Sequence, residues 1–145
     1  MLKRSFKGLG FIYSVCVVLI PIALIIGHIG AEINWREYPI STFAKKAPHD
    51  VWITAGMCLA ALSMILLGEA CRRIFEGRIF PVVLSTLFSF SAGGLLLLAY
   101  FEEETFGQRT YLTGMHDAGL ALFAATAVAA LFLLALGLLF SNHPL

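Results

Sequence analysis

The chain has 145 residues, of which 59% are hydrophobic and 13% charged, and its formal net charge at pH 7 is +1. This nearly neutral balance excludes a basic surface for nucleic acid, and the length suits one compact unit better than two. The three cysteines form no Cys-x-x-Cys pair, which leaves no thiol motif for a metal or for redox chemistry.

Four long apolar runs take up most of the chain, and each is about as long as a helix needs to cross ~30 Å of hydrocarbon. We therefore predict an all-α, polytopic membrane protein, with one domain over residues 1–145 folded as an up-down bundle. The four transmembrane helices are expected at about residues 8–27, 50–73, 79–101 and 114–140. The lipid bilayer is then the solvent for most of the surface.

The first apolar run follows Lys3, Arg4 and Lys7, and in this respect it resembles a secretory signal peptide. It continues unbroken to Gly27, however, and is longer than the 7–15-residue core of such a signal. We therefore predict an uncleaved first helix. Pro21 should kink this helix, because proline removes one backbone hydrogen bond.

The second run begins with Asp50, an acid that suits the positive end of a helix dipole. Near its other end Glu69 precedes Arg72 and Arg73 by three and four residues, a spacing that predicts an ion pair reaching toward the membrane surface. The third run carries Pro81 in its expected first turn, where a missing N–H is tolerated.

Small residues recur every four positions in the third and fourth runs. Because such spacing lets helix backbones approach closely, we expect these two faces to pack against neighbouring helices. The residues are Ser85, Ser89 and Gly93 in the third run and Ala121, Ala125 and Ala129 in the fourth.

The orientation follows from lysines and arginines near the helix ends, which favour the cytoplasmic side. One side carries six such cations and the other carries four, so both termini are predicted to be cytoplasmic. Segments 28–50 and 102–117 would be extracytoplasmic, with a short interfacial helix near Ser41–Lys46, and the membrane would be the inner or plasma membrane of a prokaryote. The cations are Lys3, Arg4, Lys7, Arg72, Arg73 and Arg78 against Arg36, Lys45, Lys46 and Arg109.

Histidines and carboxylates gather at the predicted outer helix ends. Imidazole and carboxylate ligands suit zinc, and glutamates also suit magnesium or calcium, so a metal site is one interpretation. A solvated rim with separate helix caps is the other, because no recognised ligand spacing is present; a b-type haem would need two histidines facing each other at one depth. The candidate metal ligands are His28, His49, Asp50, Glu102, His116 and Asp117.

The apolar runs contain no mid-membrane charge, and the chain has no Gly-rich phosphate loop or catalytic serine motif. We therefore favour a non-enzymatic accessory or assembly subunit, whose partners are other membrane subunits or a second copy of itself. The alternative is a metal-dependent hydrolase, with zinc activating water beside lipid head groups at the outer face.

Two segments resemble a family of prokaryotic membrane proteins. The first runs from Tyr38 to Met57 and contains Ile40-Ser41-x-Phe43-Ala44, followed by Trp52 at the start of a helix. The second runs from Phe101 to His116, an acidic segment that leads to Thr113-Gly114-x-His116. Both are similar to segments of the family called domain of unknown function 998. The resemblance implies a polytopic membrane protein, here with fewer helices than many members have, and it implies no activity.

Overall fold

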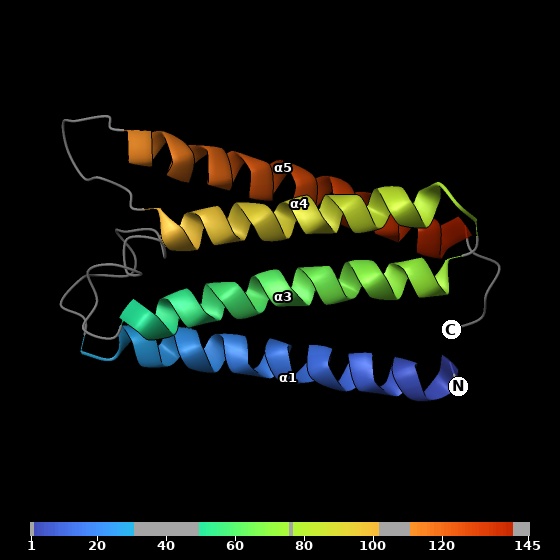
Figure 1. The fold of residues 1–145 in the computed structure, drawn as a ribbon, viewed down its shortest axis with the longest axis horizontal. Coiled ribbons are helices and arrows are strands. Elements are labelled where there is room, and N and C mark those ends of the chain that lie inside the picture. The colour runs from blue at the N-terminus through green and yellow to red at the C-terminus, as the bar shows by residue number, and fades with distance from the viewer. Residues whose placement is uncertain (1, 31–49, 76, 102–110, 141–145) are drawn as a thin grey trace.

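The computed structural model describes residues 2–30, 50–75, 77–101 and 111–140, with the backbone alone for 2–7, 9, 50 and 111–113. These residues form four helices and no strand, so the predicted all-α fold is confirmed. Consecutive helices are antiparallel, as in an up-down bundle (Figure 1). They are α1 (Leu2–His28), α3 (Asp50–Ile74), α4 (Phe80–Tyr100) and α5 (Tyr111–Phe140).

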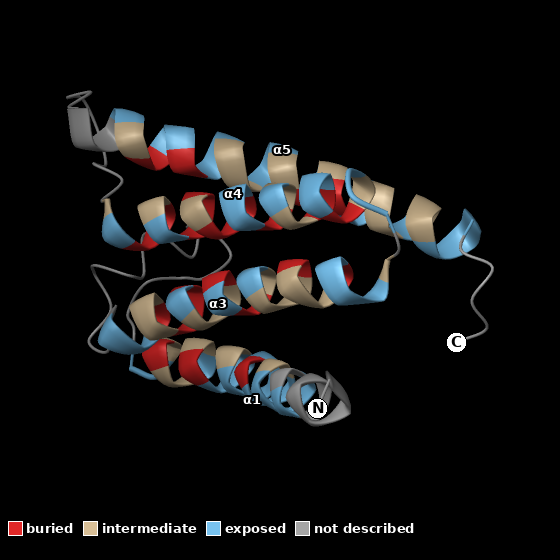
Figure 2. Cartoon of the chain, turned by 45° about the vertical axis from the view of Figure 1, so that its right-hand side comes forward, coloured by how far each residue is buried: buried red, intermediate tan, exposed pale blue. Residues whose placement is uncertain are grey.

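Each helix is long and apolar enough to cross a membrane. The apolar spans are Gly10–His28, Val51–Ile74, Phe80–Tyr100 and Gly114–Phe140. Large apolar side chains point outward along all four of them, and buried residues lie where neighbouring helices face each other (Figure 2). Such a surface would be unfavourable in water, so the fold indicates a multi-pass integral membrane protein.

The helices pack in the order of the chain. Contacts join α1 to α3, α3 to α4 and α4 to α5, and no other pair of these helices brings Cα atoms within 8 Å. Figure 1 shows the resulting row, with α1 and α5 at its edges. Each edge helix therefore has one helical neighbour within the part of the chain that the structure describes.

The two ends of the bundle differ. We call one the turn end, where α1 starts, the short turn joins α3 to α4, and α5 stops. We call the other the His end, where α1 and α4 stop and α3 and α5 start (Figure 1). Two apolar clusters centred on α3 and α4 fill the interior between these ends. Toward the His end the buried residues are Ile53, Met57, Ala61, Ala92, Leu95, Leu98 and Ala99; toward the turn end they are Cys71, Leu84, Phe88 and Ala130.

A close approach of helix backbones joins α4 to α5 and depends on two glycines. A Cβ atom on Gly94 would lie 2.5 Å from the backbone nitrogen of Phe123 and 2.7 Å from the carbonyl oxygen of Gly119. One on Gly119 would lie 2.7 Å from the Cβ of Leu97. Only hydrogen fits at these positions, and the short backbone separation adds dispersion contacts along both helices.

The turn end is held by aromatic packing. The rings of Phe75 and Phe80 meet edge to face, with their centroids 5.2 Å apart, and both lie against Gly137 of α5. Gly77 supplies the left-handed backbone that the turn requires, at φ +100°. Pro81 lies in the first turn of α4, as its sequence position predicts.

Side-chain positions confirm one further sequence expectation and contradict another. Arg73 donates to Glu69 at 2.8 Å, so the predicted ion pair forms with this arginine. The small-residue faces were expected to pack on neighbouring helices. Ser85 does so, since a Cβ on Gly68 of α3 would lie 3.2 Å from the Ser85 Cα atom, but Ser89 and Ala125 are exposed and a Cβ on Gly93 would meet nothing within 4 Å. That prediction is wrong for the contact between α4 and α5, since the two helices meet through Gly94 and Gly119 instead.

Candidate functional site

Four of the six predicted metal ligands belong to the described part of the chain. His28 closes α1, Asp50 is the first residue of α3, and His116 and Asp117 lie near the start of α5. All four are therefore at the His end of the bundle, as predicted from their places near helix ends. The structure gives only the backbone of Asp50, and His49 and Glu102 fall outside the described residues.

His28 forms a contact within its own helix. Its Nδ1 atom lies 2.6 Å from the carbonyl oxygen of Leu24, one turn earlier, and the ring is half-buried. A carbonyl oxygen only accepts, so Nδ1 carries the proton in this contact. The ring therefore closes the last turn of α1, where free carbonyl groups need donors.

His116 is buried, with 3% of its surface exposed. It shares a helix face with Gly119 and Phe123, three and seven residues later, and both of those pack against Gly94 of α4. The ring thus lies on the side of α5 that faces α4. Among the described residues, neither ring nitrogen of His116 has a hydrogen-bond partner.

An unsatisfied buried polar group of this kind costs about 1–3 kcal/mol. The adjacent residue Asp117 places its Oδ1 atom 3.8 Å from Nδ1 of His116. That distance is too long for a hydrogen bond. The Asp117 side chain is 64% exposed, so the pair joins a buried imidazole to a carboxylate in contact with solvent.

The described side chains bring together His116 and Asp117 but add no third ligand. Over the ranges with described side chains, no three histidine, cysteine, aspartate or glutamate residues form a group able to hold a metal ion. His28 lies on α1, which has no Cα atom within 8 Å of α5. A site that also includes His49, Asp50 and Glu102 stays a prediction.

A polar contact that the sequence does not predict lies in the middle of the bundle. The Ser91 hydroxyl on α4 lies 2.9 Å from the Thr126 hydroxyl on α5. Each hydroxyl also lies near the carbonyl four residues earlier, Ser91 at 3.0 Å from Leu87 and Thr126 at 2.6 Å from Leu122. Two hydroxyl protons serve three contacts, so at most two are full hydrogen bonds at once.

A sequence signal for this pair exists, because Ser91 and Thr126 are hydroxyl residues near the centres of two apolar runs. A hydroxyl in hydrocarbon needs a partner, and a neighbouring helix can provide one. The sequence does not say which helix, because each hydroxyl can also bond within its own helix. The pair can hold α4 and α5 in register, and it carries no ionisable group for acid–base chemistry.

No family model, curated protein or solved structure matches this chain. The resemblance to domain of unknown function 998 stays a prediction.

Proposed function

We propose that this chain is a non-enzymatic accessory or assembly subunit of a larger complex in the plasma membrane of a prokaryote. Its partners are helices of other membrane subunits or of a second copy. The observation that supports this is the back of α5, an edge helix whose Cα atoms come within 8 Å of α4 alone among the described helices. Ala121 and Ala125 are exposed there, one turn apart. We call these two residues the alanine face.

The alanine face lies on the side of α5 opposite the one that packs against α4. Successive residues of a helix are about 100° apart, which places Ala121 and Ala125 across the helix from Phe123 and Ala130. Ala130 is fully buried in the turn-end cluster, and Phe123 packs on the cluster near the His end. Small side chains at a four-residue spacing do not improve packing against lipid, but they let the backbone of a second helix approach closely.

Photo-crosslinking in native membranes tests this proposal. A benzophenone amino acid at position 125 should form a protein adduct, and the same group at position 124 is the control. Ala124 is exposed as well, on a side of the helix about 100° away. Ala121→Leu should abolish the adduct at position 125, because the larger side chain blocks close approach. The proposal fails if positions 124 and 125 both crosslink only to lipid.

The second candidate is the metal-dependent hydrolase acting on lipid head groups, and His116 is the observation in its favour. Its ring is buried without a hydrogen-bond partner in the described part of the chain, beside a carboxylate that reaches solvent. Zinc bound by imidazole and carboxylate would lower the pKa of a coordinated water toward about 7. Residues His49, Asp50 and Glu102 would have to supply further ligands.

Metal analysis of the purified protein separates the two candidates. The hydrolase requires bound zinc near one ion per chain, lost in the His116→Ala variant and kept in His28→Ala, whose ring is engaged with Leu24. If there is no metal, His116→Leu should instead raise the free energy of unfolding by about 1 kcal/mol or more, because it removes an unsatisfied buried polar group. That second result would exclude His116 as a ligand.

A further inference from the structure

The turn end of the bundle presents two arginines without a described acidic partner. Arg72 is exposed in the last turn of α3, and Arg78 is exposed just before α4. Arg73, between them in the chain, pairs with Glu69 at 2.8 Å. No carboxylate among the described residues lies within ion-pair distance of Arg72 or Arg78. Both guanidinium groups lie on exposed positions at this end of the bundle.

Apolar side chains surround these arginines. Ile74 is 50% exposed and Ile79 is 79% exposed, and both belong to the short segment between Arg72 and the first turn of α4. Val82 is exposed one turn into α4. Guanidinium groups next to exposed aliphatic side chains match a molecule that is charged at one end and apolar at the other.

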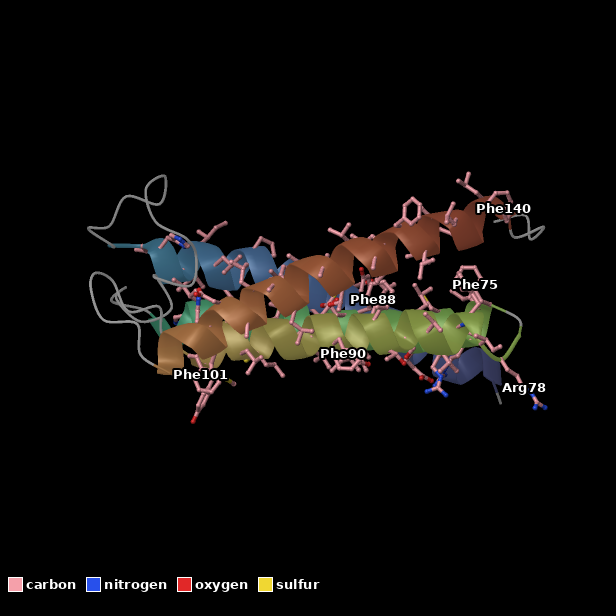
Figure 3. The ribbon with its side chains drawn as sticks, turned by 90° about the horizontal axis from the view of Figure 1, so that it is seen from above. Phe75, Arg78, Phe88, Phe90, Phe101 and Phe140 are labelled. Atoms are coloured by element: carbon pink, nitrogen blue, oxygen red, sulfur yellow. The ribbon has the colours of Figure 1, made fainter. Side chains whose placement is uncertain are left out.

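The turn fixes where the arginines lie. Gly77 allows the tight reversal, and the edge-to-face rings of Phe75 and Phe80 pack against Gly137 of α5. Figure 3 shows the Arg78 side chain extending beyond the helices, at the same end of the bundle as Phe75 and Phe140. Two charges held by a packed turn lose less conformational freedom on binding than charges on a loose loop would.

We propose that the turn end binds the phosphate of an anionic phospholipid through Arg72 and Arg78, with Ile74 and Ile79 against its acyl chains. Arginine suits this role, because its planar guanidinium donates two parallel hydrogen bonds to phosphate. The first two turns of α1 add Lys3, Arg4 and Lys7 to the same end, which strengthens the attraction to anionic lipid. Charge complementarity and the adjacent apolar surface select a membrane lipid over a free anion. The proposal does not depend on the partner subunits suggested above.

Native mass spectrometry of the full chain, released from detergent with defined lipids, tests the assignment. The wild-type protein should retain phosphatidylglycerol in preference to phosphatidylcholine. Each arginine near a charged surface contributes about fivefold in affinity, so Arg72→Gln/Arg78→Gln should reduce the preference on the order of 20-fold. Glu69→Gln/Arg73→Gln is the matched control, because it removes one cation together with its own partner and should leave the preference unchanged.

Two further measurements keep the test decisive. The preference should weaken as ionic strength rises from 0.05 to about 0.5 M, since exposed charges are screened. Millimolar inorganic phosphate should not displace the lipid; displacement would show a site for a free anion and overturn the proposal. An unchanged lipid preference in Arg72→Gln/Arg78→Gln, or an equal loss in the control variant, would also overturn it. Circular dichroism of each variant confirms that the helices remain intact.

Discussion

Two adjacent glycines show how differently single residues behave in this bundle. Gly94 faces α5, and a Cβ there would lie 2.5 Å from the backbone nitrogen of Phe123. Gly93 is only one residue away, yet a Cβ there would meet nothing within 4 Å. The difference comes from the helix turn of about 100° per residue, which points one position at the neighbouring helix and the other away from it.

This contrast predicts opposite outcomes for two alanine substitutions. Gly94→Ala should lower the free energy of unfolding by about 1–3 kcal/mol, because the obstacle is backbone that cannot turn aside. Gly93→Ala should leave it unchanged or raise it by up to about 1 kcal/mol through the higher helix propensity of alanine. Reversible unfolding in mixed detergent micelles, followed by circular dichroism, measures both. Equal losses in the two variants would mean that the close approach at Gly94 is wrong.

At the scale of helices, the sequence predicts that α4 and α5 form but not the polar contact between them. The sequence predicts the helices themselves, because the length of an apolar run sets its span. It does not predict their contact faces, since a helix that is apolar all round gives no amphipathic signal. For this reason the four-residue spacing of Ala121 and Ala125 indicates a helix face that is exposed in the structure. The Ser91–Thr126 contact is not predicted from the sequence for the same reason.

The candidate site follows the same division. The sequence predicts that His116 and Asp117 lie near the start of a helix. It also predicts that they lie at the same end of the bundle as His28. The burial of the His116 ring cannot be predicted from the sequence, because it depends on how closely α5 approaches α4 near Gly119. The separation of α1 from α5 is also invisible in the sequence, and it places His28 on a helix that does not contact the one carrying His116.

A double-mutant cycle on Ser91→Ala and Thr126→Val measures the interhelical hydroxyl contact. Each hydroxyl has its own backbone carbonyl as a second partner, so the coupling should be modest, about 0.6 kcal/mol and below about 1.7. Ser89→Ala is the control, because the Ser89 hydroxyl is exposed and bonds only the Ser85 carbonyl of its own helix. Zero coupling between Ser91 and Thr126 would show that each hydroxyl donates only to the carbonyl of its own helix.

At the scale of the whole molecule, the row of helices gives each bundle end a distinct character. The turn end combines the short turn between α3 and α4 with Arg72, Arg73, Arg78 and the basic start of α1. The His end carries His28, His116 and Asp117. Because lysine and arginine near helix ends favour the cytoplasmic side, this asymmetry predicts the direction in which the bundle crosses the membrane.

Labelling of single introduced cysteines tests that orientation. In a background with Cys16, Cys58 and Cys71 replaced by alanine, Ile29→Cys should react with a membrane-impermeant maleimide on intact cells. Arg78→Cys should react only after the membrane is permeabilised, because the turn end is predicted to face the cytoplasm. Both positions are exposed in the structure, so a missing reaction reports sidedness and not burial within the protein. Labelling of Arg78→Cys on intact cells together with protection of Ile29→Cys would reverse the orientation. It would also place the arginines of the proposed lipid site in the opposite leaflet, without altering the contacts that hold the helices together.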